Sequence, residues 1–175
     1  MRDISKPIIL DIEASGFGST SYPIEVGVAM EDDSKYCALI LPAPSWTHWD
    51  EDAESIHHIK RSTLATYGKS PREVAIQLNA LLIGKTVYSD GWVVDRPWIT
   101  TLFYEAGVNL AFEVSALEMI LSEGQMAFWH KTKLEVIADL NLIRHRASND
   151  AWIIQETYQR TYKKYRGQAD VAFET

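Results

Sequence analysis

Three closely spaced β-strand patterns within the first 41 residues are the feature that most constrains how this chain can fold. Residues 8–12 are mostly apolar, and residues 24–30 and 35–41 are rich in side chains that favour strands. The segments between them are short and contain the glycine, serine and acidic residues that favour turns. Short connections of this kind join antiparallel neighbours, so the sequence predicts a three-stranded antiparallel meander.

The remainder of the chain alternates helical and short extended patterns. A helix N-terminus is indicated by Ser70-Pro71-Arg72-Glu73, and the helix that follows should end before Gly84. A long loop with one short helical piece is expected before it, over residues 42–70. The later elements should be a strand at 86–88, a helix at 97–106, an extended piece at 110–114, and helices at 130–142 and 149–162.

This order of elements predicts an α/β protein. The expected architecture is a mixed five-stranded sheet, made of the meander and two shorter strands, flanked by helices. A chain of 175 residues with 46% hydrophobic residues suits one compact domain, so we expect residues 1–175 to form a single domain. The apolar runs are shorter than the roughly 20 residues that cross a bilayer. Because residues 1–6 also lack the apolar run of a secretory signal, we expect a cytoplasmic protein without a membrane span.

Two acidic residues interrupt the first apolar strand. Asp11 and Glu13 lie two residues apart, so the alternation of side chains along a strand directs both carboxylates to one face. Burying two ionised carboxylates together is costly unless a cation binds them. An isolated pair of this kind more often lies in solvent at the end of a strand, so the pair alone does not identify a site. The formal net charge of -7 argues against a broad basic surface for duplex nucleic acid, although carboxylates at a metal site contribute to that total.

Two later segments also contain residue types common in catalysis. His145 precedes the last predicted helix, Asp150 lies in its first turn, and Asp95 precedes the helix expected at 97–106. Each residue has a simpler explanation on its own, because helix N-termini favour acidic residues and single histidines are commonly exposed. Their combination with the acidic pair of the first strand is more specific than any one of them.

In combination, these motifs resemble the DEDDh family of 3′→5′ exonucleases, which are DnaQ-like relatives of oligoribonuclease, ribonuclease T and proofreading exonucleases. The resemblance covers nearly the whole chain and includes shorter matches at residues 14–17, 22–27 and 55–59. It implies a ribonuclease-H-like fold and a hydrolase that removes nucleoside 5′-monophosphates from the 3′ end of single-stranded RNA or DNA. It also raises the expectation of a homodimer, because several relatives of this type form one.

The same resemblance assigns roles to individual residues. The metal-binding acids would be Asp11, Glu13, Asp95 and Asp150, and the general base would be His145. Oxygen ligands without cysteine favour two divalent cations of the Mg²⁺ type, with Mn²⁺ as the alternative. The residues that meet the terminal nucleotide would be Ala14, Gly16, Phe17, Ile56 and His57.

The middle motif departs most from the family pattern. Ser89 and Asp90 replace a His-Asn pair, and Val94 replaces an aromatic residue, so Asp90 rivals Asp95 as the third acid. Two other functions remain open: a catalytically silent nucleic-acid-binding or adaptor domain of the same fold, and an endonuclease on a ribonuclease-H-like sheet. The arginines on either side of the histidine could attract phosphate, although such residues more often form solvated ion pairs.

Overall fold

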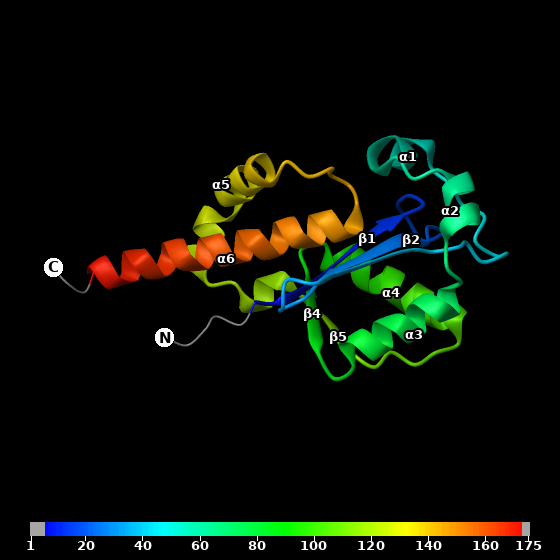
Figure 1. Ribbon diagram of the computed structural model, residues 1–175, viewed down its shortest axis with the longest axis horizontal. Helices are drawn as coiled ribbons and strands as arrows, with labels where there is room; N and C mark the ends of the chain where they lie inside the picture. Colours follow the sequence, from blue (N-terminus) through cyan, green and yellow to red (C-terminus); the bar gives the residue numbers. More distant parts are fainter. Residues whose placement is uncertain (1–5, 173–175) are drawn as a thin grey trace.

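The structure, a computed structural model, describes residues 6–172, with side chains described from 6 to 165. Most of the N-terminal segment on which the secretory-signal expectation was based therefore lies outside the described residues. The strands are β1 (Ile8–Ala14), β2 (Pro23–Ala29), β3 (Lys35–Leu39), β4 (Thr86–Ser89) and β5 (Glu113–Ala116). They form one sheet in the order β3-β2-β1-β4-β5 (Figure 1).

The pairing of these strands makes the sheet mixed. β1 pairs antiparallel with β2, and β2 pairs antiparallel with β3, which gives the predicted meander. β4 lies parallel to β1, and β5 lies parallel to β4. The predicted α/β class and the mixed five-stranded sheet are therefore confirmed.

Helices cover both faces of the sheet (Figure 1). On one face lie α3 (Pro71–Leu82) and α4 (Trp92–Ala106). On the other face α6 (Ala147–Ala172) packs against β1 and β2, and α5 (Glu123–Leu140) packs against α6. The remaining helices are α1 (Glu51–His57), α2 (Arg61–Tyr67) and a 3-10 turn, η1 (Leu117–Ile120).

The side chains of β1 alternate between two hydrophobic cores. Leu10 and Ile12 pack in the core that includes buried residues of α3 and α4. Ile9 packs in the other core, with Ala151 and Ile154 of α6. By the same alternation the two acidic residues of β1 lie on the face that α6 covers, as the sequence predicts.

Helix boundaries agree with the sequence where a capping signal was recognised. The hydroxyl of Ser70 accepts a hydrogen bond from the backbone N–H of Glu73, and α3 begins there as predicted. The predicted starts of α4 and α5 were wrong. α4 begins at Trp92, five residues before Pro97, and α5 begins at Glu123 rather than at residue 130, because Ser122 and Gln125 form a capping box there.

Other boundaries differ by smaller amounts. The segment 42–70 contains two helices rather than one short helical piece, because α2 supplies Leu64 to a core with Tyr22 and Ile24. The last strand lies at 113–116 rather than 110–114, and α6 continues well past the predicted end at 162.

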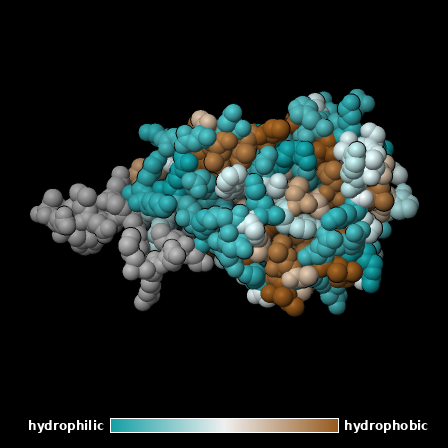
Figure 2. Space-filling view, in the orientation of Figure 1, coloured by the Kyte–Doolittle hydropathy of each residue, from teal (hydrophilic) through white to brown (hydrophobic). Residues whose placement is uncertain are grey.

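Figure 2 shows a face that is largely hydrophilic and that carries separate hydrophobic patches. Among the described residues, no helix combines the length and the apolar character that a bilayer crossing requires.

One glycine allows α6 to approach β2 closely. A Cβ atom on Gly27 would lie 2.1 Å from the backbone nitrogen of Ser148 and 2.5 Å from the carbonyl oxygen of Ala147. Both contacts are with backbone, which cannot rotate away as a flexible side chain can. The N-terminus of α6 can therefore take its position on the sheet only with glycine at residue 27.

We predict that Gly27→Ala lowers the free energy of unfolding by roughly 3 kcal/mol, at the upper end for overpacking, because α6 must move away from β2. Urea denaturation measures the loss. Gly84→Ala is the control, because a Cβ there meets nothing within 4 Å and only its φ of +70° is unfavourable. The free energy of unfolding of Gly84→Ala should be about 1 kcal/mol lower than that of the wild type. A cost for Gly27→Ala no greater than for Gly84→Ala would contradict the close packing.

Candidate active site

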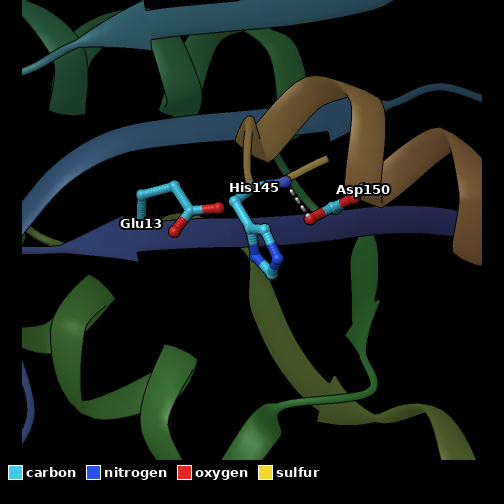
Figure 3. Close-up of side chains that lie close together, drawn as sticks. All are labelled: Glu13, His145 and Asp150. Carbon is cyan, nitrogen blue, oxygen red and sulfur yellow. Dashed lines mark hydrogen bonds between the residues drawn. The ribbon is translucent and has the colours of Figure 1, made fainter. Parts of the chain in front are cut away.

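Three of the predicted residues meet where the N-terminus of α6 reaches β1. One ligand atom from each of Glu13, His145 and Asp150 lies within 4.8 Å of the other two. Figure 3 shows the imidazole of His145 between the two carboxylates. Residues separated by more than 130 positions in the chain are thus brought into one small volume.

Hydrogen bonds around Asp150 fix this arrangement. The residue is buried in the first turn of α6, and its Oδ2 accepts a hydrogen bond of 2.9 Å from the backbone N–H of His145. Its Oδ1 accepts a hydrogen bond of 2.7 Å from Nε of Arg144. His145 has a φ of +59°, a left-handed conformation that costs energy for any residue except glycine. The turn that carries the predicted base therefore depends on these contacts.

The other two predicted acids lie close enough to affect each other electrostatically. Burial raises the pKa of Asp11 well above its usual value, and Asp95, Glu13, Asp150 and Asp90 raise it further, in that order. This means that Asp11 is surrounded by carboxylates contributed by β1, the β4–α4 segment and α6. The structure brings Glu13 and Asp150 together with His145 within 4.8 Å. Asp11 and Asp95 are connected to this group by the electrostatic effects on the pKa of Asp11.

Asp95 is held at this site by the end of β4. Its side chain is 3% exposed, and one oxygen accepts a hydrogen bond from the Ser89 hydroxyl. That hydroxyl accepts a hydrogen bond of 2.9 Å from the backbone N–H of Gly91. Burial raises the pKa of Asp95 to about 7, although the bond from Ser89 lowers it in part. Ser89, which the sequence showed only as a departure from the family pattern, thus orients the acid.

The structure also distinguishes the two candidates for the third acid. Asp90 forms an ion pair with Lys133 of α5, with 2.6 Å between Oδ2 and Nζ, and its side chain is 27% exposed. Asp95 is more deeply buried and has the larger effect on the pKa of Asp11. The geometry therefore favours Asp95.

The pKa of Glu13 indicates that the described residues supply too little positive charge beside this carboxylate. Burial raises the pKa of Glu13 to about 8, and Asp150, Glu25 and Asp95 add to the increase, while Arg146 opposes it. A carboxyl group with such a pKa is largely protonated at neutral pH unless a positive charge binds beside it. Hard oxygen donors with unbalanced negative charge fit a divalent cation such as Mg²⁺ or Mn²⁺.

A cavity of about 220 Å³ opens beside Glu13 and His145. It contains all five residues that the family resemblance assigned to the terminal nucleotide, namely Ala14, Gly16, Phe17, Ile56 and His57. Phe17 is 71% exposed and Ile56 is also exposed, so the cavity presents apolar surface to solvent. Exposed apolar surface beside polar catalytic residue types is characteristic of a ligand pocket.

The wall of this cavity is built by α1 and the loop after β1. The backbone N–H of Ile59 donates a 3.0 Å hydrogen bond to Nδ1 of His57, so the proton of the neutral ring is on Nε2. Burial lowers the pKa of His57, which favours this neutral form. His58, which replaces a glycine of the family pattern, has a φ of +57° at the end of α1, a conformation that glycine adopts most easily.

Sequence reasoning did not identify Glu25 or Lys133 as parts of the site. Both act through contacts between segments far apart in the chain. Glu25 and Arg146 are 121 residues apart in the sequence, and Lys133 and Asp90 are 43 residues apart. Glu25 lies within one of the short family matches, which was the only signal available.

Comparisons with known proteins locate the fold. No protein-family model and no curated protein sequence matches this chain. Among solved structures, exonuclease I superposes with a TM-score of 0.65 at 11% identity, over 85% of this chain and 39% of that chain. An E. coli exonuclease I complex with single-stranded DNA and zinc superposes with a TM-score of 0.69 at 12% identity, over 88% of this chain and 40% of that chain. A product-bound exonuclease I superposes with a TM-score of 0.60 at 12% identity, over 89% of this chain and 42% of that chain.

The chain thus spans about two fifths of the exonuclease I chains that it matches. At this level of identity the likeness concerns the arrangement of helices and strands. The chain has the ribonuclease-H-like fold of the matched region of exonuclease I.

Proposed function

We propose that this protein is a metal-dependent 3′→5′ exonuclease that releases nucleoside 5′-monophosphates from single-stranded RNA or DNA. The observation that supports this most strongly is the convergence of Glu13, His145 and Asp150 within 4.8 Å. Glu13 and His145 also line an apolar cavity, on a fold shared with exonuclease I. We further propose that residues 1–175 act as a single nuclease domain.

Two divalent cations, Mg²⁺ or Mn²⁺, would be held by Asp11, Glu13, Asp95 and Asp150. When bound, such cations activate water and neutralise charge on the phosphate and on the departing oxygen. The fit to this chain rests on the grouping of Glu13, His145 and Asp150 and on the raised pKa values of Asp11, Glu13 and Asp95, which reflect burial first and neighbouring carboxylates second. E. coli exonuclease I has also been observed with bound zinc, which is a property of that protein.

His145 would act as the general base. Its imidazole lies beside the two carboxylates rather than being buried in a core, so it can reach a water molecule at the phosphate (Figure 3). Imidazole is the side chain that most often acts as a general base in enzymes. The hydrogen bond from its backbone N–H to Asp150 holds the residue in place.

The adjoining cavity would hold the terminal nucleotide. Unstacked bases bind between aromatic or apolar side chains, which Phe17 and Ile56 present. His57 would contribute to the wall of this pocket. E. coli exonuclease I binds single-stranded oligonucleotides, which supports single strands as the substrate here. We propose no homodimer, because the likeness to exonuclease I extends only to the fold of one chain and gives no support for one.

The direct test is digestion of 5′-labelled single strands of RNA and DNA in Mg²⁺. We expect a ladder that shortens from a free 3′ end, no reaction on a 3′-blocked or circular strand, and complete loss with a chelator. Cutting of circular strands would favour the endonuclease alternative. Binding without any turnover would favour the silent nucleic-acid-binding domain.

The acids of the β4–α4 segment provide a matched pair of variants. We predict that Asp95→Asn lowers kcat at least about a hundredfold, more than is typical for a residue that only orients metal ligands. Asp90→Asn should have a clearly smaller effect, because this residue is paired with Lys133. Steady-state assays at saturating Mg²⁺ measure both. The reverse order would show that Asp90 is the third acid.

The pKa of Glu13 predicts how the metal-free protein responds to pH. Because folding raises this pKa from 4.5 to about 8, stability that is present below pH 4.5 is lost as the pH rises through 8. Glu13→Gln removes the ionisable group, so it should raise the free energy of unfolding above pH 8. The gain should be about 1 kcal/mol or more, since one pKa unit corresponds to about 1.4 kcal/mol.

Urea denaturation with a chelator, at about pH 4 and about pH 9, checks this prediction. The variant and the wild type should be equally stable at the lower pH. Mg²⁺ at the higher pH should stabilise the wild type but not the variant. A variant that is less stable than the wild type at high pH would show that Glu13 is not repelled by its neighbours.

A further inference from the structure

A buried ion pair connects β2 to the turn that carries His145. Glu25, in the middle of β2, is 0% exposed, yet its carboxylate lies against Arg146, the residue that follows the predicted base. Nη2 of Arg146 donates a 2.6 Å hydrogen bond to Oε1, and Nε lies 3.1 Å from Oε1 and 3.2 Å from Oε2. The backbone N–H of Ala147 donates a 2.8 Å hydrogen bond to Oε2. Both oxygens of Glu25 are therefore occupied.

We propose that Glu25 and Arg146, which we call the Glu25–Arg146 clamp, are positioning residues that set the location of His145 relative to the carboxylates of the active site. This inference rests on the proposed role of His145 as the base. Neither residue of the clamp lines the cavity, so its effect on the position of His145 would be exerted through the backbone of residues 145–147, in addition to the electrostatic effect of Arg146 on Glu13.

The location of the clamp in the sheet supports this role. In the β1–β2 register, Glu25 lies directly opposite Glu13. Cross-strand partners point to the same face, so the clamp joins the His145 turn to the strand position beside Glu13. The separation between imidazole and carboxylate is thus controlled by one β-sheet pair and one ion pair, without a flexible loop between them.

The conformation of the turn gives a reason for such a clamp. His145 has a φ of +59°, which a non-glycine residue adopts only when its surroundings hold it there. Its own N–H is bound by Asp150, and two residues later the N–H of Ala147 is bound by Glu25. The left-handed residue is therefore fixed on both sides.

The same contacts have a purely structural explanation, in which the clamp only attaches α6 to the sheet. Gly27 already allows close packing of α6 against β2, so attachment does not by itself require a buried charge. An isolated buried carboxylate is costly, and a bidentate arginine offsets that cost while also imposing a direction. Directional control is what a catalytic imidazole needs, because small displacements reduce rates strongly.

The two explanations differ in the behaviour of His145 when the protein remains folded. In protein labelled with ¹³C-histidine, the imidazole resonance of His145 is assigned by its loss in His145→Ala. In metal-free Arg146→Gln we expect this resonance to shift or broaden. In the nuclease assay we expect kcat to fall by about tenfold or more, with KM changed by less than about twofold. Arg146→Lys keeps the positive charge but cannot form the bidentate contact of the guanidinium group, so it should give an intermediate result. If Arg146→Gln does not fold, Arg146→Lys is measured in its place.

Arg160→Gln is the matched control. It removes an arginine of α6 that pairs with Glu156 of α6 and with Asp139 of α5, so it tests the general effect of losing an ion pair from α6. A folded Arg146→Gln with the wild-type resonance and wild-type kcat would overturn the proposal, as would an equal change in Arg160→Gln. The resonance is measured without metal or substrate, so an inactive wild-type protein would refute the proposed function without affecting this result.

Discussion

The burial of several carboxylates together at the end of β1 is the constraint on which the rest of the structure depends. Asp11 and Glu13 come from β1, while Asp95 and Asp150 come from the first turns of α4 and α6. A fold that buries these groups together loses stability unless each has a compensating contact. Ser89 provides one for Asp95, and Arg144 provides one for Asp150. Such an arrangement is costly for a protein without a ligand, and it suits a protein that binds cations.

The same constraint accounts for the way in which the helices are attached. α6 must place its first turn against β1 and β2, and Gly27 and Glu25 on β2 allow and direct this contact. The cavity beside the acids is closed by α1, a short helix between the meander and α3. Apolar surface on Phe17 and Ile56 then remains exposed next to a charged cluster. The proposed nucleotide pocket and the proposed metal site would thus adjoin each other on one surface.

Much of this could be predicted from the sequence, because it depends on local patterns. Alternation along residues 8–13 placed Asp11 and Glu13 on one face, and Ser70 and Pro71 identified the start of α3. The five residues that the resemblance assigned to the nucleotide line one cavity, and Glu13, His145 and Asp150 lie together, while their roles stay a prediction. The start of α4 was misplaced because Pro97 fits the first turn of a helix, whereas here it lies one turn further in. Contacts such as Glu25 with Arg146 could not be predicted, since no periodicity links residues 121 positions apart.

The central claim is that these carboxylates share bound cations. Anomalous diffraction from crystals grown with Mn²⁺ measures this directly, because the ion is located independently of the protein atoms. The account predicts one or two Mn²⁺ peaks within coordination distance of Asp11, Glu13, Asp95 and Asp150. Well-ordered carboxylates with no peak among them, or Mn²⁺ bound only at other acidic residues, would contradict it.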